Sequence, residues 1–292
     1  MDRAVSLRGI MDPANKALWF VEGRFAADIS LDEVAAACGV SRFHLARAFA
    51  AATGQSVGRY MRGRRLTEAS KRLANGAPDI LAVALEAGYG SHEAFTRAFR
   101  DQFGATPETV RAQRHLDNLA LVEAIKMDRT PLADLPAPRI EQGKAMLIAG
   151  LGDRYNINST SKNIPALWQK LAPHLGHVPG QARERGVTFG VSYNMDDEGN
   201  FDYLAGVEVK DFSGLGPEFT RLRLASQRYA VFAHGDHVSS IGRVHMTIWN
   251  HWLPESDYEA VDAPNFERYG ESFDGRTGNG GFEIWVPVKQ KG

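Results

Sequence analysis

The feature that most constrains this chain is a near-repeat at a spacing of fifty residues, between residues 41–54 and residues 91–104. Each copy has a serine that can cap a helix, apolar residues four and eight positions later, and an arginine six positions later. These residues are Ser41, Leu45, Arg47 and Phe49 in the first copy and Ser91, Phe95, Arg97 and Phe99 in the second. Positions four residues apart share one helix face, so the apolar pairs are predicted to point into a core and the arginines outward.

Helix start and stop signals surround both copies of the repeat. Residues 30–33 read Ser-Leu-Asp-Glu, which is typical of a capping box, and Gly39 ends the short helix that follows. The same order of short helix, glycine turn and longer helix returns over residues 80–103. This order predicts two helix-turn-helix units. A longer helix over residues 56–74 joins them, and the Thr-Pro pair at 106–107 begins a last helix.

The composition excludes several classes of protein. Cys38 is the only cysteine, so an internal disulfide and a cysteine-based metal site are excluded. No apolar run approaches the roughly 18 residues that a membrane-spanning helix needs, and the N-terminus lacks the apolar region of a signal peptide. The sequence contains no nucleophile elbow or phosphate-binding loop. We therefore expect a cytoplasmic protein with no membrane partner and no cofactor.

The net charge of −1 conceals an asymmetry between the two ends of the chain. Residues 1–127 contain 17 Lys and Arg against 14 Asp and Glu, a net of +3, whereas residues 128–292 contain 17 against 21, a net of −4. Six basic residues fall within fourteen positions, which is enough for several phosphate contacts, although an ordinary solvated helix has the same pattern. They are Arg59, Arg62, Arg64, Arg65, Lys71 and Arg72.

The outward residues of the repeated helices suit the reading of DNA. A recognition helix enters the major groove, where Arg47 or Arg97 can bind O6 and N7 of guanine with two hydrogen bonds. Two such helices on one rigid unit fit successive major-groove segments about 10 base pairs apart, which predicts an asymmetric DNA site. Phe43 would contact a thymine methyl group or pack on a neighbouring helix. Glu93 would accept a hydrogen bond from cytosine N4 or orient Arg97.

These positions resemble the AraC/XylS family of transcriptional regulators over residues 10–114. The matching residues include Leu31, Ala35, Gly39, Leu45, Arg47, Phe49, Gly54, Tyr60, Leu66, Leu73, Ala84, Gly88, Tyr89, Phe95, Arg97, Phe99, Gly104, Pro107 and Arg111. The resemblance implies an all-α DNA-binding domain of seven helices, with the helix over 56–74 joining the two helix-turn-helix units. We expect double-stranded DNA and RNA polymerase as partners.

The same resemblance assigns base-reading positions to both recognition helices. They are Arg42, Phe43, Ala46 and Arg47 in the first helix, and Ser91, His92, Glu93 and Arg97 in the second. Ala46 departs from the polar residues often found at its position in the family. The first helix is therefore expected to read fewer bases than the second.

The chain changes character near residue 130. Prolines at 131, 136 and 138 mark a linker, and strand-like runs with two helical stretches follow it. The strands are expected at 146–151, 187–193, 201–209, 221–224, 229–234 and 282–288, and the helices at 161–174 and 238–252. The order of strand, helix, strand and strand occurs twice, which predicts a pseudo-duplicated α+β domain. We expect a first domain over 1–127, a linker over 128–137 and a second domain over 138–290.

Carboxylates among the aromatic residues of the second half point to a ligand pocket. Glu283 and Trp285 lie two positions apart in a predicted strand and therefore share a face, and Glu208 lies similarly among apolar residues. A carboxylate beside aromatic rings is costly unless it is solvated or paired. The pattern therefore fits a pocket for a cation or polar ligand, and equally a solvent-exposed sheet face.

This half resembles the GyrI-like, or effector-binding, domain over residues 138–289. The resemblance rests on the segments 164–168, 203–209, 229–232, 249–254, 266–269 and 283–287. It implies an aromatic-lined pocket in which a glutamate binds a small amphipathic, often cationic effector. The expected pocket residues are Trp168, Tyr203, Glu267, Glu283 and Trp285. Which of Glu208, Glu267 and Glu283 faces the ligand stays open.

Other functions stay open for the second half. Some stand-alone GyrI-like relatives are thought to hydrolyse small molecules with a glutamate and a tyrosine, here Glu283 and Tyr203, and a ligand-free protein-interaction module is a further alternative. Histidine pairs at 174 and 177 and at 234 and 237 lack a spaced third ligand, so they fit surface residues better than a metal site. The favoured function is a DNA-binding transcriptional regulator, expected to be an activator and not an enzyme, that senses a small molecule.

Overall fold

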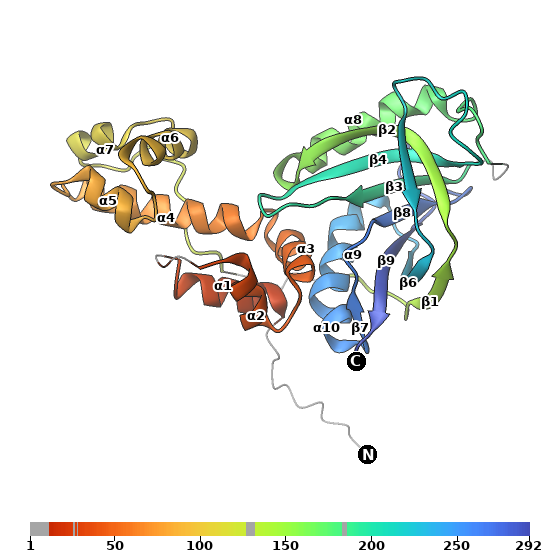
Figure 1. Ribbon diagram of the computed structural model, residues 1–292, viewed down its shortest axis with the longest axis horizontal. Coiled ribbons are helices and arrows are strands. Elements are labelled where there is room, and N and C mark those ends of the chain that lie inside the picture. Colours follow the sequence, from red (N-terminus) through yellow and green to blue (C-terminus); the bar gives the residue numbers. More distant parts are fainter. Residues whose placement is uncertain (1–11, 26, 28, 127–131, 183–185) are drawn as a thin grey trace, which may run out of the picture. The chain divides into compact units, whose positions relative to one another are not determined.

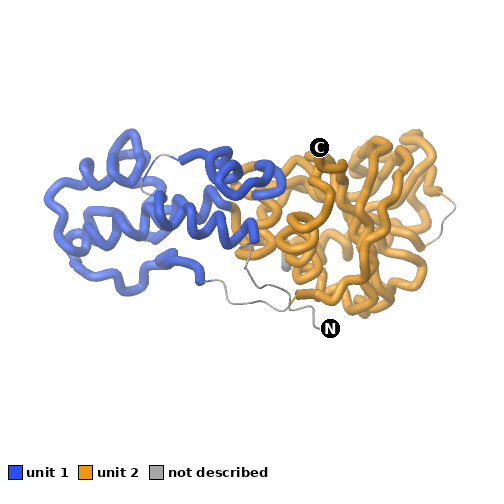
Figure 2. Tube along the Cα trace, turned by 90° about the horizontal axis from the view of Figure 1, so that it is seen from below, with its two compact units in different colours: residues 1–45, 57–128 blue, residues 46–56, 129–292 orange. Residues whose placement is uncertain are grey.

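A computed structural model of the chain describes residues 12–25, 27, 29–126, 132–182 and 186–292. The chain divides into two compact units. Unit 1 comprises residues 1–45 and 57–128, and unit 2 comprises residues 46–56 and 129–292. Figure 2 shows unit 1 in blue and unit 2 in orange. Within the described part of the chain, every helix is too short or too polar to cross a lipid bilayer.

Helices provide all the regular secondary structure in the described residues of unit 1 (Figure 1). They are α1 (Pro13–Glu22), α2 (Leu31–Cys38), α3 (Arg42–Thr53), α4 (Val57–Ala74), α5 (Ile80–Glu86), α6 (His92–Phe103) and α7 (Pro107–Gln113). Only the first turn of α3 counts with unit 1, because residues 46–56 belong to unit 2. The two predicted pairs of short and long helix, α2 with α3 and α5 with α6, are confirmed.

The expected capping residues set the ends of these helices. Ser30 Oγ accepts a hydrogen bond from the N–H of Glu33 at 3.2 Å, and Glu33 Oε2 accepts from the N–H of Ser30 at 2.7 Å, which completes the capping box. Gly39 ends α2 with a φ of 72°, in the left-handed region that favours glycine. Thr106 caps α7, and Pro107 at its first position has no N–H that would need a partner.

The apolar stripe of the repeat is buried, as predicted. Leu45, Phe49, Phe95 and Phe99 are each 0% exposed. On α6 the ring centroids of Phe95 and Phe99 lie 5.4 Å apart, and those of Phe99 and Phe103 lie 4.7 Å apart. These three rings belong to a core cluster to which α4, α5 and α7 also contribute apolar side chains. The row of rings therefore joins α6 to the other helices of its half of unit 1.

Residues 114–126 have no regular secondary structure, yet hydrogen bonds hold this segment along α4. The N–H of Val122 donates to Thr67 Oγ1 at 2.9 Å, and the N–H of Ile125 donates to Tyr60 Oη at 3.1 Å. A Cβ atom on Gly63 would lie 2.7 Å from a methyl carbon of Val122. A glycine inside α4 costs some helix stability but lets this segment approach the helix closely.

Unit 2 contains an antiparallel sheet and several short helices (Figure 1). The strands are β1 (Arg139–Gly143), β2 (Met146–Asn156), β3 (Thr188–Tyr193), β4 (Asn200–Val209), β5 (Thr220–Leu224), β6 (Gln227–His234), β7 (Tyr258–Ala260), β8 (Asn265–Tyr269) and β9 (Phe282–Gln290). The helices are α8 (Thr160–Leu171), α9 (Ile241–Thr247) and α10 (Leu253–Glu255), with 3-10 turns η1 (Ile157–Ser159), η2 (Ala172–His174) and η3 (Val238–Ser240) and a π-helical segment η4 (Ile248–Trp252).

The strand order confirms the predicted duplication. The sheet runs β1-β6-β9-β8-β3-β4-β2-β5, and β7 pairs with β9. Its inner six strands read β6-β9-β8 on one side and β2-β4-β3 on the other, and the two sets meet at the antiparallel pair β8–β3. The first set follows the order β6, α9, β8, β9 along the chain, and the second follows β2, α8, β3, β4. Each repeat is therefore a strand, a helix and two strands.

Three strands, β1, β7 and β8, lie outside the predicted set. The omission of β8 matters most, because this strand lies between β3 and β9 near the middle of the sheet. It reads Asn-Phe-Glu-Arg-Tyr, and only two of these five residues are apolar or aromatic. Backbone pairing with a strand on each side, rather than the composition of the segment, makes this segment a strand.

The two faces of the sheet have different surroundings. On one face Ile148, Leu204 and Phe266 belong to an apolar cluster formed by the strands. On the other face α8 packs against β2 and β4, and its leucines form a cluster with Tyr203 and Ala205. Neighbouring residues of a strand point to opposite faces, which is why Leu204 and Tyr203 belong to different clusters. We call the face that includes Tyr203 the helix face.

Candidate functional site

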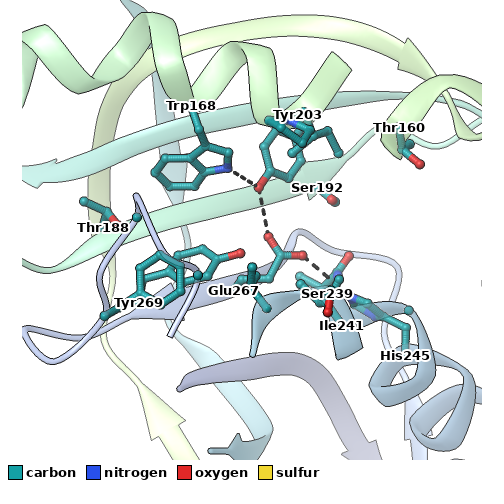
Figure 3. Close-up of a pocket in the computed structure, with 18 of the residues that line it drawn as sticks. Thr160, Trp168, Thr188, Ser192, Tyr203, Ser239, Ile241, His245, Glu267 and Tyr269 are labelled. Carbon is teal, nitrogen blue, oxygen red and sulfur yellow. Dashed lines mark hydrogen bonds and ion pairs between the residues drawn. The ribbon is translucent and has the colours of Figure 1, made fainter. Parts of the chain in front are cut away.

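A cleft lies on the helix face of unit 2, where side chains of β3, β4 and β8 meet those of α8 and α9 (Figure 3). Its volume is about 1800 Å³. Small-molecule pockets are typically about 300–1,000 Å³, so a small ligand would fill only part of it. Trp168, Tyr203 and Tyr269 line the cleft together with Glu267, the one carboxylate among its described lining residues.

A directed chain of hydrogen bonds runs from Trp168 through Tyr203 to Glu267 (Figure 3). Trp168 Nε1 donates to Tyr203 Oη at 3.2 Å, and Tyr203 Oη donates to Glu267 Oε2 at 3.1 Å. An indole N–H can only donate, so the phenol oxygen accepts from it and directs its own proton to the carboxylate. A hydrogen-bond donor therefore points at Glu267 Oε2.

Burial keeps the two phenols of the cleft neutral. It raises the pKa of Tyr203 well above the ordinary value, and the negative charge of Glu267 adds to the rise. The pKa of Tyr269 is raised by the same two causes. The side chain of Glu267 is only 7% exposed. A carboxylate this far from water is unfavourable unless a positive charge or several donors compensate it.

Gly190 provides the space in which Tyr203 and Glu267 meet. On β3 it pairs with Ala205 of β4 on one side and with Glu267 of β8 on the other. A Cβ atom at position 190 would come closer than 3.0 Å to both Tyr203 Oη and Glu267 Oε2, a separation that real Cβ atoms essentially never show. Any other residue at this position would force the two side chains apart.

The rest of the cleft is mostly apolar, and its other ionisable lining residues are Arg47, His245 and Arg276. The His245 imidazole on α9 lies with Nε2 3.5 Å from Glu267 Oε1, the carboxylate oxygen that Tyr203 does not use (Figure 3). The rings of Trp168 and Tyr269 meet edge to face, with their centroids 5.3 Å apart. Further lining comes from Ile164, Met195, Ile241, Trp249 and Phe273. A buried carboxylate among aromatic rings suits a ligand with a positive group and apolar substituents.

The structure brings together three of the five predicted pocket residues, namely Trp168, Tyr203 and Glu267. Glu283 and Trp285 lie on the opposite face of the sheet. Across the β8–β9 pair, Phe266 is opposite Trp285, Glu267 opposite Ile284 and Arg268 opposite Glu283. Residues paired across strands share a face, so Glu283 and Trp285 project on the side away from Glu267.

Glu283 already has partners on that opposite face. Its Oε1 accepts from Arg139 at 2.8 Å, and its Oε2 accepts from Trp285 Nε1 at 3.0 Å and lies 3.6 Å from Arg268. Glu208 is on the same side and lies 3.8 Å from Lys144. The structure therefore does not bring Glu283 and Tyr203 together as a catalytic pair.

Tyr269 and His245 are cleft residues that the sequence-based set did not include. Tyr269 lies two positions after Glu267, and alternation along β8 would have placed both on one face if the strand had been recognised. His245 lies in the predicted helix over 238–252, but nothing in the helix pattern distinguishes it from a surface histidine. Its proximity to Glu267 follows from the packing of α9 against the sheet.

The predicted DNA-reading residues of the first recognition helix have different surroundings. Arg42 is half-exposed and lies 3.2 Å from Asp32 of α2, and Phe43 and Ala46 are half-buried. Arg47 belongs to unit 2, where it is buried with its guanidinium 5.6 Å from the ring centroid of Trp249. Burial lowers the pKa of Arg47 to about 10, so the side chain stays charged at neutral pH. Base reading requires an exposed side chain, and for Arg47 it stays a prediction.

The residues of the second recognition helix lie at the start and along the first half of α6. Ser91 is the N-cap of the helix, and His92 Nε2 lies 3.0 Å from a carboxylate oxygen of Glu108 on α7. Glu93 and Arg97 are exposed. The pKa of Glu93 is lowered by its own backbone N–H and by Ser91, so it is a carboxylate at the positive end of the helix. Arg97 is thus an exposed guanidinium on the predicted reading face.

Clustered basic residues of α4 bind partners inside unit 1. Arg64 is 8% exposed and donates to both carboxylate oxygens of Glu22, at 2.9 and 3.0 Å, which raises the pKa of Arg64. Further pairings are Arg65 with the carbonyls of Phe25 and Ala27, Lys71 with Glu68 and Glu123, and Arg72 with Glu86. These side chains connect α4 to its neighbours, so phosphate binding is not needed to explain the cluster.

The predicted histidine pair at 234 and 237 makes hydrogen bonds. His234 Nε2 lies 2.8 Å from Ser240 Oγ, and His237 lies 2.9 Å from Ser239 Oγ and 2.8 Å from the carbonyl oxygen of Thr277. Among the residues that the structure describes, no three His, Cys, Asp or Glu side chains are grouped to hold a metal ion. These contacts give His237 a structural role in a turn.

Comparison with protein families accounts for both units. A model described as the GyrI-like small molecule binding domain matches residues 136–289, which is more than half of the chain. The chain belongs to the GyrI-like family. The cleft lies within this GyrI-like domain, except where residues 46–56 line it. A second model, described as a helix-turn-helix domain, matches residues 34–113.

Some curated relatives of this GyrI-like chain match nearly its whole length, and others match only part of it. The transcriptional regulator Rob of Salmonella typhimurium is 25% identical over 99% of this chain and 100% of its own length. The right origin-binding protein of Escherichia coli is 24% identical over the same shares. The multiple antibiotic resistance protein MarA of Salmonella typhimurium is 32% identical, over 37% of this chain and 80% of its own length.

Solved structures resemble the two halves separately. SAV2435 bound to tetraphenylphosphonium is 21% identical, covers 52% of this chain and 93% of that one, and gives a TM-score of 0.43. A transcriptional regulator with an AraC-type DNA-binding domain from Chromobacterium violaceum is 30% identical, covers 36% of this chain and 94% of that one, and gives a TM-score of 0.34.

Proposed function

We propose that this GyrI-like chain is a transcriptional regulator that binds double-stranded DNA through its helix-turn-helix units and a small amphipathic cation through Glu267. The observation that carries the effector half is the buried Glu267 carboxylate, at the end of a donor chain and inside an aromatic cleft. A cationic group would compensate this charge, and apolar substituents would be buried against Trp168 and Tyr269.

Replacing Glu267 tests the effector half. Glu267→Gln keeps the size of the side chain and its ability to accept from Tyr203, but removes the charge. We expect the affinity for tetraphenylphosphonium, a monocation with four phenyl groups, to fall at least about tenfold, which corresponds to about 1.4 kcal/mol. The affinity is measured on the full chain by calorimetry and by tryptophan fluorescence.

Glu283→Gln is the matched control, because it removes a carboxylate from the opposite face of the same sheet. Its affinity is expected to stay within about twofold of that of the wild-type chain. Thermal unfolding of both variants verifies that they are folded. Equal affinities of wild type and Glu267→Gln would refute the assignment of Glu267, and a loss confined to Glu283→Gln would move the site to the other face.

The DNA-binding half rests on the helix-turn-helix match over residues 34–113 and on the relatives Rob and MarA. Rob is a transcriptional regulator by name and is similar over nearly the whole chain. The resemblance to AraC-type regulators extends the proposal to activation through RNA polymerase and to a cytoplasmic location, where DNA and polymerase are present. The proposed readers are the seven residues of α3 and α6 named above and the N-cap Ser91, and Arg97 is the exposed arginine among those of α6.

Arg97→Ala tests direct base reading. An arginine with two hydrogen bonds to guanine contributes about 1–3 kcal/mol of discrimination, so specific affinity should fall roughly 5- to 150-fold while non-specific affinity changes little. A site selected from random DNA with the wild-type chain supplies the probe, and fluorescence anisotropy at several fixed salt concentrations gives both affinities. Arg100→Ala, three residues further along α6, is the control for loss of one exposed positive charge. An equal loss of both affinities in Arg97→Ala would mean a phosphate contact instead.

A further inference from the structure

His245 stands beside the carboxylate that the proposed function assigns to the effector. Its Nε2 lies 3.5 Å from Glu267 Oε1, while Oε2 accepts the Tyr203 hydroxyl at 3.1 Å. The two oxygens of Glu267 therefore face different partners from different elements, as Figure 3 shows. The side chains of His245 and Glu267 are 22% and 7% exposed. Charges so far from water attract each other more strongly than at the surface.

The other ionisable groups near Glu267 keep one charge state across the neutral range. Tyr203 on β4 and Tyr269 on β8 are neutral, because burial and the charge of Glu267 raise their pKa values well above the ordinary value. Arg47 is influenced by the charges of Asp262 and Glu267, and with a pKa of about 10 it stays positive. Imidazole is the side chain that ordinarily changes charge between pH 5 and 8. Among these groups, His245 is the imidazole that lies beside Glu267.

We propose that His245, when protonated, is a displaceable counter-ion of Glu267 and that an effector cation binds by displacing its proton. This inference rests on the proposed function of Glu267. The N–H bond at His245 breaks, the proton passes to water, and neutral imidazole remains beside the bound cation. Charge balances, because one positive charge enters the cleft as another leaves it. Two positive charges at one buried carboxylate would repel each other, which is why binding and protonation compete.

This competition makes His245 a specificity-determining residue. A neutral aromatic molecule gains nothing from displacing the proton, so its binding does not depend on the charge of His245. A cation gains the attraction of Glu267 only after the imidazole has lost its proton. Affinity for cations therefore increases with pH through the titration range of histidine and becomes constant above it.

Calorimetry of the full chain with tetraphenylphosphonium at pH 6.0, 7.0 and 8.0 measures this exchange. Each pH is repeated in two buffers of different ionisation enthalpy, which gives the number of protons released. We expect the affinity to be at least about twofold weaker at pH 6.0 than at pH 8.0, because imidazole ordinarily changes charge within this range. Up to about one proton should be released at pH 6.0, and nearly none at pH 8.0.

Three variants separate the role of His245 from other effects of pH. His245→Gln should release no proton, vary less than about twofold over this range, and bind more tightly than wild type at pH 6.0. His245→Lys keeps a positive charge in place and should bind weakly at every pH. His251→Gln, in η4 and outside the residues that line the cleft, should behave like wild type. Thermal unfolding confirms that each variant is folded.

The outcomes distinguish this inference from the function on which it rests. Two outcomes would refute the proton exchange without refuting the cation site at Glu267. One is proton release that persists unchanged in His245→Gln. The other is wild-type binding that depends on Glu267 but not on pH. A wild-type chain that fails to bind the cation at pH 8.0 would overturn both. Proton release that His245→Gln abolishes and His251→Gln preserves supports the exchange.

Discussion

Gly190→Ala is expected to lower the free energy of unfolding of unit 2 by about 2–5 kcal/mol and to weaken tetraphenylphosphonium binding at least tenfold. The added Cβ would collide with both Tyr203 Oη and Glu267 Oε2. Overpacking costs about 1–3 kcal/mol, and separating the pair leaves a buried carboxylate without its donor at a similar further cost. Chemical denaturation and calorimetry measure the two effects on the same preparations.

Two further variants decide whether the collision is the cause. At Gly235 an added Cβ would meet nothing within 4 Å, so Gly235→Ala should change stability by less than about 0.5 kcal/mol. Tyr203→Phe removes the oxygen with which the new methyl group collides. Combined with Gly190→Ala it should cost less stability than the two separate losses added together. If the double variant loses as much stability as the two single variants added together, the proposed collision is contradicted.

Phe99→Ala is expected to destabilise unit 1 by about 3–5 kcal/mol, the cost of removing a buried phenyl ring. Phe99 is fully buried on α6 between Phe95 and Phe103, in the row of rings that joins this helix to the rest of the core. For a domain of this size the loss should lower the helical melting transition by more than about 10 °C. Circular dichroism at 222 nm measures the transition, and DNA affinity should fall as α6 loses its support.

Conservative and exposed substitutions are the controls for Phe99. Phe99→Leu retains most of the apolar volume and should cost much less than Phe99→Ala. Leu85→Ala lies on the neighbouring helix α5, where the side chain is 56% exposed, and should change stability by less than about 0.5 kcal/mol. Equal losses of stability in Phe99→Ala and Leu85→Ala would contradict the prediction that the apolar positions of the repeat stabilise the core of unit 1.

The sequence was sufficient for structure that depends on neighbours within one or two turns. Ser30, Gly39 and Thr106 act as caps because their hydrogen bonds reach only a few residues along the chain. The apolar stripe containing Phe95 and Phe99 is likewise a property of one helix. Such signals predicted helices α2 to α7 of unit 1, whereas the course of residues 114–126 depends on contacts with α4 that no periodicity encodes.

The candidate site depended on information that single strands do not contain. Glu267 and Glu283 have the same local pattern, since each is followed two residues later by an aromatic ring, Tyr269 or Trp285. Alternation shows that each pair shares a face but not which face the helices cover. Strand order and register, which are non-local, place Glu267 in the cleft and Glu283 beside Arg139.

Arg47 shows the same limit in a helix. Periodicity placed its side chain outward on its own helix, and that helix forms as predicted. The ring of Trp249, about two hundred positions later in the sequence, nevertheless lies over the guanidinium. A pattern within one helix holds no information about a partner so distant along the chain. The helix pattern therefore predicted which way the Arg47 side chain points, but not whether it is exposed.

The meeting of the two repeats at β3 and β8 makes the cleft a shared property of both. Trp168 and Tyr203 come from the first repeat, and Glu267 and His245 come from the second. A cation held among them would act as a brace between the repeats. At a concentration 100 times its Kd, such a ligand adds about 2.7 kcal/mol to the free energy of unfolding. The amount of effector in the cell would then govern how long the folded domain survives proteolysis as well as how often its cleft is filled.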